Sequence, residues 1–137
     1  MYLVKQLAPI KTALVNKFYA QHSVRGRANK QDQLWVVYHN NNIVAAARVQ
    51  HKAQLLLLST VFVAAQYRGQ GLAKMLLKTL LSQQPQTLYT FAYHNVVDLY
   101  LSLGFNLVLT YNPALLVLFD TYKHRNIVAL EYRSVEK

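Results

Sequence analysis

The sequence predicts a mixed α/β (α+β) domain built on one central sheet. Short apolar runs rich in branched residues alternate with segments whose apolar residues recur at helical spacing. Two of these runs flank residues 39–42, where asparagines tolerate the left-handed conformations of a hairpin turn. The 137 residues suffice for one core, so we expect a single domain over residues 1–137.

The first half is predicted to contain four strands and one helix. A strand covers residues 2–6, and a helix runs from Pro9 to about Gln21, since proline suits a first helical turn. We expect this helix to bury Ile10, Ala13, Leu14 and Phe18. Residues 22–33 form a polar, basic loop or a short irregular helix. Strands at 34–38, 43–49 and 55–63 then follow one another antiparallel.

The second half begins with a helix at 71–83, with Leu72, Met75, Leu76 and Leu80 on its buried side. A crossover helix makes the next strand, 87–93, parallel to strand 55–63. His94 or Asn95 is expected to cap a helix at 96–103, which Gly104 ends. A strand at 106–110, a helix at 114–124 and a strand at 127–133 complete the chain.

The composition excludes several classes of protein. Hydrophobic residues make up 53% of the chain, but the run at 55–58 is far shorter than a membrane span, so no membrane contact is expected. The N-terminal segment lacks a signal-peptide pattern, which predicts a cytoplasmic location. Without cysteine there is no thiol nucleophile, and five scattered histidines lack metal-ligand spacing, so no metal is expected.

Residues 66–71 form a turn between the long strand and the following helix. Gly69 and Gly71 permit left-handed backbone and bring no Cβ against a ligand. The amides of residues 68–73 lie at the helix N-terminus, where unpaired donors and the dipole favour phosphate. A dinucleotide fingerprint is excluded because Lys74 stands where its third glycine should be, and no Walker loop occurs.

The pattern Gln66-x-x-Gly69-x-Gly71 resembles the acyl-CoA loop of the GNAT family of N-acetyltransferases. A second segment, 97–105, in which Tyr100 precedes Leu103-Gly104-Phe105, is similar to that family's helix motif. Both occur in the family's order and spacing. The resemblance covers nearly the whole chain and implies a mostly antiparallel sheet of six to seven strands, flanked by helices, whose fourth and fifth strands splay apart.

The resemblance implies where acetyl-CoA, the co-substrate, would bind. Backbone groups of Phe62 and Val63 would pair with the pantetheine arm. Amides of the turn would hold the pyrophosphate, and these belong to Arg68, Gly69, Gln70, Gly71, Leu72 and Ala73. Asn95 lies closer to Tyr100 than the family's usual asparagine, and we expect a helix cap that touches CoA.

The same resemblance assigns Tyr100 as the general acid that protonates the departing thiolate. Many family members use a glutamate on the fourth strand as the base, but this chain has Ser59 and Thr60 there. His51 and His94 have the pKa range of a base. A water relay or an acceptor that is already neutral would need no base at all.

The implied function is acetyl transfer to a primary amine of a small molecule, peptide or protein. Two alternatives stay open: an amine linked to nucleic acid, such as aminoacyl-tRNA, and an acyl-CoA-binding module without turnover. The net charge of +10 indicates an anionic partner, either CoA itself or RNA. Arg25, Arg27 and Lys30 motivate the RNA-linked acceptor. The sequence does not decide the oligomeric state, and a homodimer stays open.

Overall fold

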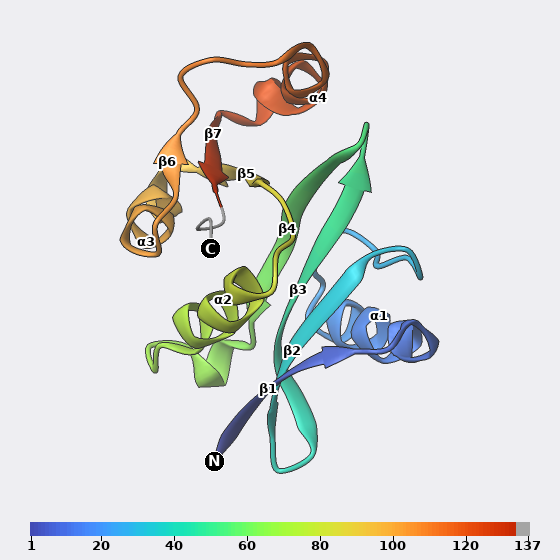
Figure 1. Cartoon of the computed structure of the whole chain (residues 1–137). Helices are drawn as coiled ribbons and strands as arrows, with labels where there is room; N and C mark the ends of the chain where they lie inside the picture. The colour runs from blue at the N-terminus through green and yellow to red at the C-terminus, as the bar shows by residue number, and fades with distance from the viewer. Residues whose placement is uncertain (134–137) are drawn as a thin grey trace.

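One seven-stranded sheet organises the computed structural model, which describes residues 1–133 (Figure 1). The strands are β1 (Tyr2–Leu7), β2 (Gln33–His39), β3 (Asn42–Lys52), β4 (Leu55–Val63), β5 (Leu88–Tyr93), β6 (Asn106–Leu107) and β7 (Ile127–Tyr132). Their order across the sheet is β1-β2-β3-β4-β5-β7-β6. All neighbours are antiparallel except β4 and β5, which are parallel. The predicted fold class and the parallel pair are therefore confirmed.

Four α-helices cover the two faces of the sheet in pairs. They are α1 (Thr12–Gln21), α2 (Leu72–Ser82), α3 (Val97–Ser102) and α4 (Pro113–Tyr122) within residues 1–133. Successive side chains of a strand point to opposite faces. Leu58 packs with α2 and with Tyr100 of α3, whereas its neighbour Leu57 packs with Leu115 of α4. Phe18 of α1 packs with Ala46, which also points away from the α2 side. We call the two sides the α2 face and the α1 face.

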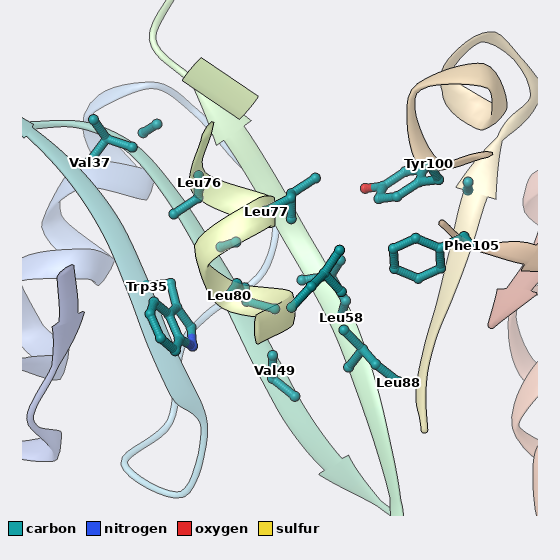
Figure 2. Packing of buried hydrophobic residues seen from close by; sticks show 14 of the residues in the cluster. Trp35, Val37, Val49, Leu58, Leu76, Leu77, Leu80, Leu88, Tyr100 and Phe105 are labelled. Atoms are coloured by element: carbon teal, nitrogen blue, oxygen red, sulfur yellow. The ribbon is translucent and has the colours of Figure 1, made fainter. Parts of the chain in front are cut away.

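The larger core lies on the α2 face. Figure 2 shows Leu76, Leu77 and Leu80 of α2 between Trp35 of β2 and Leu58 of β4. Side chains from both halves of the chain meet there, since Leu88, Tyr100 and Phe105 complete the cluster. Burying one such leucine contributes about 1.5–3 kcal/mol. This core holds α2, and with it the glycine turn that precedes α2, firmly against β4.

The buried side of α1 differs from the prediction. Val15, Phe18 and Tyr19 are buried, whereas Ile10 is 87% exposed and Leu14 is 46% exposed; Ala13 is exposed as well. A 3-10 turn at Pro9–Lys11 precedes the helix, so Ile10 lies outside its periodicity. Tyr19 can be buried because its hydroxyl donates to the carbonyl oxygen of Thr60 at 2.7 Å.

Three smaller expectations were wrong. Val96 is the N-cap of α3, without a side-chain hydrogen bond, because a 3-10 turn at His94–Val96 precedes the helix; neither His94 nor Asn95 caps it. Met75 is 38% exposed, since α2 instead buries Leu77 and Leu81. β6 is only two residues long, and α4 starts at Pro113, where Asn112 caps it. None of the helices in residues 1–133 is long and apolar enough to cross a membrane.

Candidate active site

β4 and β5 pair over only part of their length and then separate. Their pairing covers Leu56 to Leu58 against Leu88 to Thr90, and the Thr90 hydroxyl donates to the Leu58 carbonyl at 3.0 Å. Beyond this point both strands continue, to Val63 and Tyr93, without pairing to each other. A cleft of about 1250 Å³ opens between them. Residues of both faces line this cleft, so it crosses the sheet.

A bulge in β4 lies at the start of this separation. Phe62 pairs with Ala46 and Ser59 with Arg48, so Thr60 and Val61 together oppose a single β3 residue. Thr60 has a φ of +54°, a left-handed conformation that costs a β-branched residue about 1–3 kcal/mol. Such a bulge interrupts the ladder and redirects the strand. The bulge accordingly frees backbone groups of β4 from β3 beside the cleft.

A buried polar network fixes the bulge from the α1 face. The Tyr19 hydroxyl donates to the Thr60 carbonyl, and Nε of Arg48 donates to Thr60 Oγ1 at 2.9 Å. Nη1 of Arg48 forms a salt bridge of 3.0 Å with Asp32, whose carboxylate also accepts from the amide of Asn29. Both side chains of the ion pair are almost entirely buried. The network stabilises an otherwise costly conformation.

The glycine turn lies at the mouth of the cleft, on the α2 face. Gly69 and Gly71 have φ of +79° and +77°, the left-handed region that glycine adopts without strain. A Cβ on either glycine would meet no atom within 4 Å among the described residues. Gly71 is the N-cap of α2, so unpaired amides and the positive end of the helix dipole lie at the cleft. This arrangement suits a diphosphate.

Arg68 lies across the end of β4. Its Nε donates to the carbonyl oxygen of Val63 at 2.9 Å, and its guanidinium lies 5.1 Å from the centre of the Phe62 ring. The Val63 carbonyl is one of the groups expected to pair with the pantetheine arm. Arg68 therefore competes for the same carbonyl oxygen that this pairing would use. Turned outward, its charge would be free to meet a phosphate at the glycine turn.

Tyr100 enters the cleft from α3. Its ring is buried to 6% exposure and contacts Phe105 edge-on, with 5.2 Å between ring centres. In Figure 2 its phenol oxygen points away from α3, toward the strand that carries Leu58. Burial raises the pKa of Tyr100 to about 12, an effect that the Thr90 hydroxyl reduces in part. The phenol is therefore protonated at neutral pH and can donate its proton.

The cleft brings together most of the residues predicted for the site. Its walls include Phe62, Val63, Arg68, Gly69, Gly71, Leu72, Ala73 and Tyr100. Gln70 points elsewhere, since its side chain accepts a hydrogen bond from Tyr2. Asn95 is exposed and is not part of the wall.

Other residues of the cleft wall were not predicted from the sequence. His51 and His94, the two candidate bases, do not line the cleft, whereas His124 does. Arg48 and Arg125 also reach it, although they are 77 positions apart in the sequence. No motif marks these positions, since only the pairing of the strands brings them to one place. Among residues 1–133, no group of three or more potential metal ligands occurs.

A sheet opened between parallel strands, with a glycine turn at the mouth and a phenol inside, suits an extended ligand with a diphosphate at one end, as an acyl-CoA has. The family model described as acetyltransferase (GNAT) domain matches residues 5–111. The chain therefore belongs to the GNAT family of acetyltransferases. A comparison with curated protein sequences gave no match.

Solved structures with this fold include several acetyltransferases. The ribosomal-protein-S18-alanine N-acetyltransferase from Escherichia coli is 18% identical, with a TM-score of 0.71, over 100% of this chain and 97% of that one. Escherichia coli ElaA is 15% identical, with a TM-score of 0.66, over 97% and 100%. N-acetylglutamate synthase from Neisseria gonorrhoeae, complexed with coenzyme A and N-acetyl-glutamate, is 16% identical, with a TM-score of 0.69. This chain is 99% covered there but spans only 36% of that synthase. At these identities the likeness concerns the fold.

Proposed function

We propose that this protein transfers an acetyl group from acetyl-CoA directly to a primary amine of a small molecule, peptide or protein. The observation that carries this proposal is the opening between β4 and β5 directly beside the glycine turn. An extended arm ending in a thioester fits between strands that have stopped pairing with each other. A diphosphate at one end of that arm would meet the unpaired amides of α2.

In this proposal the backbone of Phe62 and Val63 pairs with the pantetheine arm. The amides of residues 68–73 bind the pyrophosphate, with Gln70 contributing its main chain while its side chain faces Tyr2. Asn95 is left as a peripheral contact to CoA, because its side chain is exposed outside the cleft wall. This placement directs the thioester toward the bulge at Thr60 and toward Tyr100.

The chemical step needs one bond formed and one broken. The neutral amine attacks the thioester carbonyl, and a β4 amide freed by the bulge stabilises the oxyanion. The tetrahedral intermediate then collapses, the carbon–sulfur bond breaks, and the electron pair leaves with sulfur. Tyr100 donates its proton to that thiolate. The amine nitrogen loses its extra proton to solvent or through a water relay.

A binding measurement tests the position of the pyrophosphate. Gly71→Glu places a carboxylate and a side chain at a left-handed position against the expected phosphates. We expect calorimetry to show acetyl-CoA affinity reduced by about tenfold or more, since like charges repel at short range. Gln21→Glu, which adds the same charge on exposed α1, is the control. Undiminished affinity in Gly71→Glu would exclude this placement.

A module that binds acyl-CoA without turnover is the second candidate. The observation that favours it is that none of the carboxylates in residues 1–133 lines the cleft, so the usual base of the family is missing. The two functions differ in one measurement, the release of free CoA thiol from acetyl-CoA with a panel of amines. Release that depends on the amine establishes the transferase, whereas binding without release establishes the module.

A further inference from the structure

Two groups of cations line the cleft. Arg68 and Lys74 belong to the segment that carries the glycine turn and the start of α2. Arg25, Arg48 and Arg125 come from three other segments, the loop before β2, β3 and the turn after α4. Arg48 belongs to the α1 face, because it alternates along β3 with Ala47 and Val49, which pack on the α2 face. The second group is therefore separate from the expected pyrophosphate site.

Distance along β4 supports this separation. Gly26, next to Arg25, lies over Thr60, since a Cβ on Gly26 would come within 3.1 Å of the Thr60 hydroxyl oxygen. Arg68 lies instead over Val63. The two contacts therefore lie three residues apart along β4. The two groups of cations thus approach different positions of the strand.

Arg48 is fixed in place and keeps one unused donor, although its charge is paired with Asp32. Its Nε and Nη1 are occupied by Thr60 and Asp32, which fix the plane of the guanidinium. Nη2 receives no hydrogen-bond partner from residues 1–133, and it lies 3.5 Å from the Cβ position of Gly26. Glycine at this place, with a φ of +107°, leaves the approach to Nη2 open. Only a group small enough to enter the cleft can reach this buried side chain.

Arg125 lines the same cleft from the turn after α4. It follows α4 in the 3-10 turn Lys123–Arg125 and lies over the Tyr122 ring, 5.2 Å from its centre. His124 lines the same wall. Asp32 already pairs with Arg48, whereas Arg25 and Arg125 have no carboxylate partner among residues 1–133. A second ammonium group on the acceptor would be repelled here, and an anionic group would be attracted.

We infer that the acceptor is a small primary amine that also carries a carboxylate, as an amino acid does. This inference rests on the proposed transferase function. Arg25, Arg48 and Arg125 receive the carboxylate on the α1 face, while the amine points between the strands toward the thioester. Pairing the carboxylate with arginine also removes the negative charge that keeps the neighbouring ammonium protonated. Binding itself thus favours the neutral, nucleophilic amine in a cleft without a carboxylate base.

Matched acceptors test the inference in the wild-type protein. CoA release is measured with free amino acids, with the corresponding amino-acid amides, and with spermidine. The amides keep the amine but lack the carboxylate, and their amine is the less basic of the two. We expect kcat/KM at least about tenfold higher for the best amino acid than for its amide, the usual scale for a lost hydrogen-bonded ion pair. Spermidine should be the poorest acceptor.

Two arginines of one loop provide a matched pair of variants. Arg25→Gln removes a cation of the cleft wall, whereas Arg27→Gln removes a cation that is also exposed but is not part of that wall. We expect Arg25→Gln to lower kcat/KM for amino acids about tenfold, mainly through KM, and to leave the rate with amides unchanged. Arg27→Gln should match wild type with both. We do not substitute Arg48, because its loss would leave the buried Asp32 carboxylate without its ion-pair partner and destabilise the fold.

The possible outcomes separate the inference from the function. Efficient turnover of spermidine or of amides would contradict the inference that the acceptor carries a carboxylate. An Arg25→Gln defect that also affects amides would contradict it too. Both results would leave the proposed transferase function intact. A preference for an aminoacyl-tRNA, with Arg27→Gln as harmful as Arg25→Gln, would mean that the positive charge of this loop binds RNA. That result would overturn the inference. If acetyl-CoA binds but no amine causes release of the CoA thiol, both the inference and the transferase function are wrong. If acetyl-CoA does not bind at all, the proposed function fails at its first step.

Discussion

Tyr100 is the residue on which the proposed chemistry depends most directly. Tyr100→Phe keeps the buried ring and its contact with Phe105 but removes the proton. We expect turnover to fall about 100-fold, the usual contribution of a general acid, with acetyl-CoA affinity unchanged. Steady-state rates and calorimetry on one preparation measure both quantities. Because a thiolate leaves fairly easily, an unaltered kcat would assign Tyr100 to packing alone.

The same substitution should change how stability depends on pH. Burial raises the pKa of Tyr100 to about 12, above the value of about 10 in an unfolded chain. The folded state therefore binds this proton more tightly. The resulting stability is fully present below about pH 10 and is lost as the pH rises through about 12.

We therefore expect the urea midpoint of the wild type to fall more steeply than that of Tyr100→Phe between about pH 9 and about pH 11.5. Burial also raises the pKa of Tyr19, but both proteins share that group, so the difference between the curves isolates Tyr100. Parallel curves would mean that water reaches the phenol in the folded protein.

At the scale of elements, α4 depends on the residue that caps its N-terminus. The Asn112 side chain accepts a hydrogen bond from the Leu115 amide at 2.8 Å, and Pro113 starts the helix. Asn112→Ala should lower the free energy of unfolding by about 1 kcal/mol, as for other N-caps. Urea titration measures this, with Asn106→Ala, at an exposed position of β6, as the control. Equal loss in both variants would show that the cap contributes nothing specific.

The elements with strong local signals could be predicted from the sequence. The glycine turn, α2 and the parallel pairing of β4 with β5 follow from periodicity, glycine chemistry and the length of the crossover. The buried side of α1 could not be predicted. It is set by the 3-10 turn before the helix and by a hydrogen bond from Tyr19 to Thr60, 41 residues away. Helical spacing alone does not contain that contact.

The site divides in the same way. The glycine turn, where we expect the pyrophosphate, is one continuous segment, so a local motif describes it. The α1 face of the site is assembled from the loop at Arg25, the middle of β3 and the turn after α4. Arg48 reaches the cleft because of its position in the alternation of β3 and because of the bulge opposite it. Such positions depend on strand register, which a single sequence does not reveal.

At the scale of the whole molecule, the excess positive charge should strengthen the binding of any polyanion. The chain has a net charge of +10. Raising NaCl from about 50 mM to about 500 mM should weaken acetyl-CoA binding roughly five- to tenfold, because salt screens these interactions. Calorimetry measures it, and S-acetylpantetheine, which lacks the nucleotide phosphates, is the control. An equal response from both ligands would place the salt effect outside the phosphate site.

The cleft crosses the sheet, with the glycine turn at its α2 face and the arginines at its α1 face. In the proposed arrangement the two substrates occupy separate parts of this cleft, so both can be bound at the same time. We therefore expect sequential kinetics with intersecting reciprocal plots, measured by varying both substrates. Parallel lines would instead indicate a covalent acyl-protein. Separate places for the two substrates in one cleft let the next thioester bind while an amine is already in place.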